Sequence, residues 1–159
     1  MSNRIFIYLT IIATLVLNSC AIKTDLTQAR MYEQQGDYEK ARAYYRTHME
    51  RRLRDKKRPA EENPYYYLIT IGDLYRKEKQ YERALGSYDE ARANQVPAEP
   101  LIFRYRDIAS DMQQEGKYDE AIDLLTIYHD LDPLLFDVDI DRVHKAMLAA
   151  EDRNKSIAK

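Results

Sequence analysis

The chain has 159 residues and a nearly balanced charge, with 25 Lys and Arg against 27 Asp and Glu. This balance argues against nucleic acid as a partner, because nucleic-acid-binding domains usually carry a strong basic excess. A single cysteine excludes an intramolecular disulfide. Only four glycines occur, and no Ser/Gly-rich linker interrupts the chain, so we expect one elongated, mostly helical domain after the N-terminal segment.

The first 20 residues form a segment of a different kind. Arg4 supplies one positive charge, and residues 5–17 are an almost uninterrupted apolar run of 13 residues. A bilayer-spanning helix needs about 20 apolar residues, whereas the apolar core of a secretory signal has about 7–15. The sequence therefore predicts a signal peptide over residues 1–19.

That segment ends in the letters LNSC at residues 17–20, which resemble the lipobox of bacterial lipoproteins. The resemblance implies that Cys20 becomes the N-terminus and carries lipid, and several acyl chains hold a protein on a membrane where one chain is marginal. In that family an aspartate after the cysteine retains the protein in the inner membrane. Ala21 therefore implies an outer-membrane lipoprotein facing the periplasm. In the alternative reading, Cys20 is incidental and the apolar run is an uncleaved anchor.

A short phrase recurs three times in the rest of the chain. It reads GDYEKA at residues 36–41, KQYERA at 79–84 and GKYDEA at 116–121. Each copy follows one stretch with helical spacing and opens another, and Gly116 can take the left-handed conformation that ends a helix. A helix pair with this aromatic and alanine pattern resembles the tetratricopeptide repeat, whose period is 34 residues.

The resemblance implies an all-α solenoid of about three helix-turn-helix repeats within residues 20–136. The expected repeats cover residues 22–55, 65–98 and 102–135. The first is the least regular, because polar Asp25 and Gln28 stand where later copies have apolar residues.

A capping helix is predicted over residues 137–153, followed by a disordered tail at 154–159. Its apolar residues are expected to cover the end of the third repeat, as terminal helices of solenoids do. These residues are Val138, Ile140, Val143, Met147 and Leu148.

No pattern of catalytic chemistry is found. The three histidines, His48, His129 and His144, form no HExxH or Cys/His arrangement. Phosphate-binding glycine loops and nucleophile elbows are also missing from the sequence. We therefore predict no catalytic residues, no metal, no cofactor and no enzymatic activity.

The resemblance also implies that the first helix of each repeat lines a concave binding groove. Aromatic and arginine side chains at matching positions would suit a protein partner, because binding hot spots are enriched in them. The candidate residues are Arg30, Tyr66, Asp73, Arg76, Phe103 and Arg106. We expect them to bind a peptide with apolar and acidic side chains. Only one basic residue matches the clamp by which one subfamily grips C-terminal carboxylates, so that ligand is rejected.

The favoured function is a lipid-anchored scaffold or assembly factor in a cell-envelope complex, similar in plan to the repeat lipoproteins of pilus assembly. The alternative is a carrier of lipid or a small hydrophobic ligand, against which the charged groove residues argue. A basic run at residues 46–58 has two readings. It is either a solvated helix end or a contact for phosphate head groups or an acidic partner.

Overall fold

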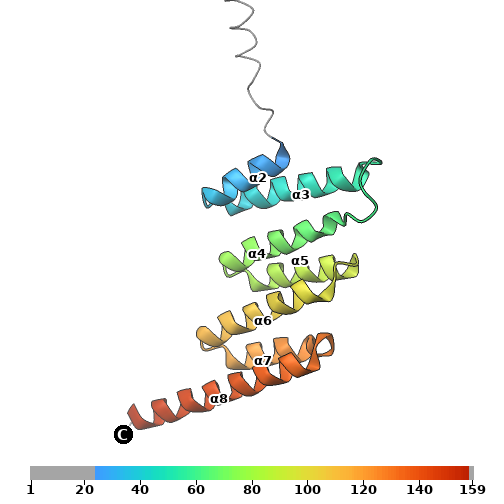
Figure 1. Ribbon diagram of the computed structural model, residues 1–159. Coiled ribbons are helices and arrows are strands. Elements are labelled where there is room, and N and C mark those ends of the chain that lie inside the picture. The colour runs from blue at the N-terminus through green and yellow to red at the C-terminus, as the bar shows by residue number, and fades with distance from the viewer. Residues whose placement is uncertain (1–23, 158–159) are drawn as a thin grey trace, which may run out of the picture. The chain divides into compact units, whose positions relative to one another are not determined.

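The computed structural model describes residues 24–157, which contain helices and turns but no strand (Figure 1). The predicted all-α fold, a tetratricopeptide-like helical repeat, is confirmed. The elements are α2 (Asp25–Gln34), α3 (Tyr38–Arg54), the 3₁₀ turn η1 (Pro64–Tyr66), α4 (Tyr67–Lys77), α5 (Tyr81–Ala93), α6 (Ala98–Gln114), α7 (Tyr118–Ile127), the 3₁₀ turn η2 (His129–Leu131) and α8 (Pro133–Ile157). The chain divides into two compact units, one up to Tyr44 and one from Tyr45.

The first unit contains α2 and the beginning of α3. The Thr24 hydroxyl caps α2 by accepting a hydrogen bond from the Thr27 backbone N–H at 3.2 Å. Ala29 is fully buried. The rings of Tyr32 and Tyr44 stack with their centroids 5.5 Å apart. Aromatic stacking therefore supplements the few apolar side chains that residues 24–44 contribute.

The three repeated phrases fold into the same turn. Gly36 and Gly116 adopt left-handed φ angles of 77° and 78°, and Lys79 adopts φ 59° at the matching position of the second copy. In each turn, the following N–H bonds a carbonyl five residues back; Lys117 N, for example, lies 2.9 Å from Met112 O. This is the Schellman ending of a helix. The spacing that marked the repeats in the sequence is therefore the spacing of helix ends.

The core of the second unit is rich in tyrosine. The ring of Tyr105 stacks on Tyr128 at 3.6 Å and meets Tyr88 edge-on at 5.9 Å. Both Tyr105 and Tyr128 donate their hydroxyls to Asp89, at 2.8 and 2.9 Å. Burial, and then the hydrogen bond to Asp89, raises the pKa of both phenols. The rings thus fill the core while one carboxylate on α5 satisfies their polar ends.

The last helix differs from the expected one. It starts at Pro133, not at residue 137, because Asp132 caps it by accepting from Leu135 N at 3.2 Å and proline suits a first helical position. It also continues through Ile157, over residues for which a disordered tail was expected.

The buried face of α8 also differs from the expected one. Phe136 and Val143 are fully buried, while Val138 and Leu148 are exposed. The expectation included Val143 but missed Phe136, which lies between the predicted third repeat, ending at residue 135, and the predicted start of the capping helix at 137.

Candidate partner-binding face

In the second unit, α6 contacts both α4 and α8. Ion pairs join α4 to α6, and Arg106 of α6 pairs with Asp139 of α8. The partners of Asp73 and Arg76 on α6 are Arg104 and Asp107, so the pairs advance by three residues on both helices. The two helices therefore run in the same direction. We call this surface the α4/α6/α8 face.

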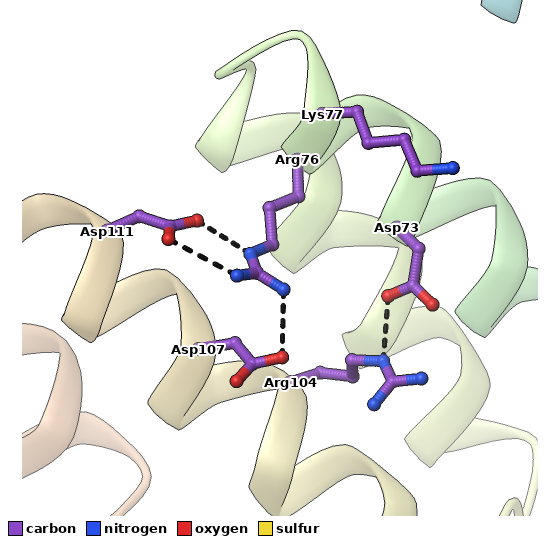
Figure 2. A pocket seen from close by; sticks show the side chains of 6 residues that line it. All are labelled: Asp73, Arg76, Lys77, Arg104, Asp107 and Asp111. Atoms are coloured by element: carbon purple, nitrogen blue, oxygen red, sulfur yellow. Dashed lines mark hydrogen bonds and ion pairs between the residues drawn. The ribbon is translucent and has the colours of Figure 1, made fainter.

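A hollow of about 400 Å³ lies between α4 and α6 (Figure 2). Three basic and three acidic side chains line it, and most point toward one another across the gap. They are Asp73, Arg76, Lys77, Arg104, Asp107 and Asp111. The lining has no formal net charge, so the hollow offers neither a cationic nor an anionic pocket.

Arg76 is the centre of this arrangement. Its Nε and Nη2 donate to the two carboxylate oxygens of Asp111 at 2.6 and 3.2 Å, and its Nη1 donates to Asp107 at 2.8 Å. The hydrogen bond to Asp111 raises the pKa of the Arg76 guanidinium. A two-point arginine–carboxylate contact fixes direction as well as distance. The contact therefore helps to hold α4 and α6 in one orientation relative to each other.

Asp73 links the face to the core. Its Oδ1 accepts from Arg104 Nε at 2.7 Å and from the buried Tyr88 hydroxyl at 2.8 Å. Burial, and then the Asp73 charge, raises the pKa of Tyr88. One carboxylate thus connects α4 with both α5 and α6.

Another ion pair joins α6 to α8. The Asp139 carboxylate is almost fully buried and accepts from Arg106 Nε and from Arg142 Nη2, the latter at 3.1 Å. The hydrogen bond to Asp139 raises the pKa of Arg106. A buried carboxylate needs such partners, because burial without them is costly.

Two large aromatic side chains stay exposed near these ion pairs. Phe103 is 53% exposed and Tyr66 is 44% exposed. With 100° per residue, Phe103 projects from α6 between the side that meets α4 through Arg104 and the side that meets α8 through Arg106. Tyr66 ends η1 directly before α4, has helical backbone angles and precedes Asp73 by seven residues, two helical turns, so it faces the same side as Asp73. Both aromatics therefore belong to the α4/α6/α8 face.

The predicted groove residues differ in whether their side chains already bind other residues of the protein. Tyr66, Asp73, Arg76, Phe103 and Arg106 come together on this face, but Asp73 and the two arginines are engaged within the protein.

Two predicted residues stand apart. Arg30 is exposed on α2 in the other compact unit, so the structure does not group it with this set. Cys20 lies outside the described residues.

The ion-pair partners were missed in the sequence. They are Arg104, Asp107, Asp111 and Asp139. Opposite charges separated by 31–35 residues, close to the repeat period, could have indicated them.

Part of the basic run at residues 46–58 is paired with acids, some inside the run and two outside it. Arg52 pairs with Glu62 through two nitrogens and with Asp55 at 2.6 Å. Arg46 lies 3.5 Å from Glu90. These contacts support the reading of a solvated helix end.

The described residues hold no cluster of His, Cys, Asp and Glu suited to a metal ion. Within the same residues, no helix is long and apolar enough to cross a membrane.

Residues 28–59 match the tetratricopeptide repeat family. The matched stretch covers most of α2, all of α3 and the beginning of the following connector, which is the repeat expected to be least regular. No curated protein matches the chain. The match supports a tetratricopeptide-repeat protein, and such repeats generally form non-enzymatic scaffolds for protein–protein interaction.

Proposed function

We propose that the chain is a lipid-anchored scaffold or assembly factor of a cell-envelope complex, held on the outer membrane and facing the periplasm. The α4/α6/α8 face would bind the partner. The observation that carries this proposal is the exposure of Tyr66 and Phe103 on a face whose charges are internally paired.

The ion pairs hold the α4/α6/α8 face in a fixed arrangement before a partner binds. Arg76, Arg104 and Arg106 tie three helices together, so little ordering is needed when a partner arrives. Prior ordering favours affinity, because immobilising side chains costs about 0.5–1.5 kcal/mol each. Tyr66 and Phe103 then supply rigid apolar contact area, which hot spots favour.

The pairing also changes the expected partner. We expected acidic side chains in the peptide, facing Arg76 and Arg106, but both arginines already bind aspartates. An acidic ligand would have to displace those carboxylates. We therefore propose a partner segment that presents apolar side chains to the two aromatics.

The spacing of the aromatics sets the length of that segment. Tyr66 lies two turns before Asp73, about 10 Å along the helix, whereas Phe103 is next to Arg104, the partner of Asp73. An extended peptide covers about 3.3–3.6 Å per residue. Neighbouring helices also lie about 8–10 Å apart, so the two anchors are separated by roughly 13–14 Å, and apolar side chains about four residues apart would reach both.

A carrier of lipid or a hydrophobic ligand is less well supported. The hollow between α4 and α6 is lined by six charged side chains, whereas pockets for small ligands are mostly apolar.

The binding proposal is tested by crosslinked affinity purification of the full chain from cells. We expect Tyr66→Ala with Phe103→Ala to abolish recovery of the partner while thermal stability and membrane attachment stay unchanged. The matched control is Lys56→Glu with Lys57→Glu, two exposed residues of the basic run. Arg52 is left intact because it pairs with Glu62. If the control lost the partner and the aromatic pair kept it, the basic run would be the binding surface.

The lipid anchor is tested separately by mass spectrometry of the N-terminal peptide. We expect a peptide that begins at acylated Cys20, and Cys20→Ala should prevent processing. An unmodified peptide beginning at Met1 would refute the lipoprotein reading.

A further inference from the structure

The outer face of α8 carries exposed apolar residues. Leu134 is 81% exposed, Val138 65% and Leu148 57%. Phe136 and Val143, both fully buried, lie on the opposite side of the helix. A terminal helix of a solenoid needs a polar outer face if it ends the stack. These three residues make the outer face of α8 less polar than the end of a solenoid usually is.

The outward residues of α8 follow a heptad. Leu134, Val138, Asp141, Lys145 and Leu148 are separated by four, three, four and three residues. This is the spacing by which one helix presents a seam to another helix in a coiled coil. Val138 and Leu148 were expected in the core, but both are exposed, so neither the core nor the α4/α6/α8 face uses them.

We propose that this seam binds a second copy of the chain, with the two α8 helices antiparallel. In one register Val138 lies against Leu148 of the second copy, and Asp141 lies against Lys145 of the second copy. A two-fold axis repeats both contacts, as an isologous interface requires. Asp141 and Lys145 already lie 3.4 Å apart within one helix. The two-fold axis would therefore create a cluster of four charges with alternating sign.

Other arrangements of two α8 helices are less favourable. A parallel, in-register pair places Asp141 on Asp141 and Lys145 on Lys145, and like charges repel. An antiparallel pair shifted by one heptad places Val138 against Asp141, which buries a charge against an apolar side chain. The antiparallel register described above matches apolar with apolar and acid with base at the centre of the seam, and it places Leu134 against Asp152 of the second copy only at the exposed ends.

The flanks of the seam bring like charges together, since Arg142 faces Arg142 and Asp137 faces Glu151. Each of these charges has a partner within its own copy. Arg142 pairs with Asp139, Asp137 with His129, and Glu151 with Lys155. The internal pairs reduce the repulsion between copies.

The seam is short compared with a stable interface, which buries about 1,600 Å² in total. We therefore expect weak, reversible dimers, with dissociation constants on the order of micromolar or weaker. This places a second contact surface on the protein, apart from the α4/α6/α8 face.

Sedimentation velocity of the full chain in mild detergent, over a concentration series, tests the proposal. We expect the apparent mass to rise from monomer to dimer. Val138→Asp with Leu148→Asp should weaken association at least tenfold. Ile127→Asp, at an exposed apolar residue outside α8, is the matched control and should leave association unchanged. A wild type that stays monomeric, or dimers that survive the α8 change, would overturn the proposal.

A charge exchange tests the register. Asp141→Lys alone and Lys145→Asp alone should each weaken association, because each places like charges together across the two-fold axis. The double change, Asp141→Lys with Lys145→Asp, should restore it. If the double variant associates no better than the single ones, the antiparallel register is wrong.

Discussion

Gly72 of α4 lies directly against the ring of Tyr88 of α5. A Cβ atom built on Gly72 would stand 2.2 Å from Tyr88 Cε1, well inside van der Waals contact. The ring cannot easily move, because Tyr88 is fully buried and its hydroxyl is bonded to Asp73. The absence of a side chain at Gly72 therefore lets α4 and α5 approach closely.

Gly72→Ala should destabilise the protein by about 1–3 kcal/mol through overpacking, even though alanine favours helices. The matched control is Gly86→Ala in α5, where a Cβ meets nothing within 4 Å. That change should stabilise by about 0.5–1 kcal/mol, because glycine weakens a helix interior. Urea unfolding measures both. Equal effects of the two changes would contradict the close packing of Gly72 and Tyr88.

Lys79→Gly should stabilise the protein by about 1 kcal/mol. Lys79 adopts a left-handed φ of 59° at a position where the other two turns have glycine, and this conformation costs an ordinary residue about 1–2 kcal/mol. The change also removes the 2.8 Å ion pair with Glu115, but the Lys79 side chain is mostly exposed, so this pair contributes little. Chemical denaturation measures the change in the free energy of unfolding. A net loss of stability would mean that the ion pair with Glu115 contributes more than the backbone strain costs.

Glu115 should make stability depend on pH in the acid range. Hydrogen bonds from Lys117, Lys79 and Tyr81 lower the pKa of its carboxyl from 4.5 to about 2. A lowered pKa means that the stabilisation is complete above about 4.5 and is lost as pH falls through about 2. Glu115→Gln should therefore flatten the melting temperature against pH in this window. An unchanged slope would show that other carboxylates cause the acid dependence.

Asp139→Ala should destabilise the protein by about 2–4 kcal/mol. The carboxylate is almost fully buried, and its removal leaves Arg106 without its partner. Asp137→Ala is the control. The Asp137 carboxylate is mostly exposed and pairs with His129. Thermal unfolding should separate the two variants by several degrees. A small effect at Asp139 would mean that water replaces the carboxylate.

The helices and their turns were predictable because their signals are local. The left-handed turn at Gly116 and the buried Ala84 and Ala121 follow from a phrase of six residues. Lys79 shows that such a phrase survives replacement of its glycine, since the neighbouring residues impose the same turn. Local sequence therefore specified where each helix pair closes.

The binding face was predicted only in part. The repeat pattern placed Tyr66 and Phe103 on it, but it could not show that Arg76 and Arg106 are occupied. Such pairing depends on the offset between neighbouring helices, which sequence periodicity does not fix to within one residue.

The reading of α8 failed for a related reason. An apolar residue such as Val138 reads as core wherever a helix is amphipathic, and buried Asp139 reads as surface. Only the position of the neighbouring helix tells the two faces apart.

Asp73 has a consequence for how the array unfolds. In a linear repeat protein, stability is divided into the intrinsic stability of each repeat and the coupling between neighbours. Asp73 contributes to both, because it binds Tyr88 within its own helix pair and Arg104 in the next. If α6 frayed, Asp73 would lose Arg104. The hydrogen-bonded pair of the Tyr88 phenol and the Asp73 carboxylate would then lack the positive charge that balances it. Amide exchange should consequently show α4, α5 and α6 opening as one cooperative block, while the last turns of α8 exchange first.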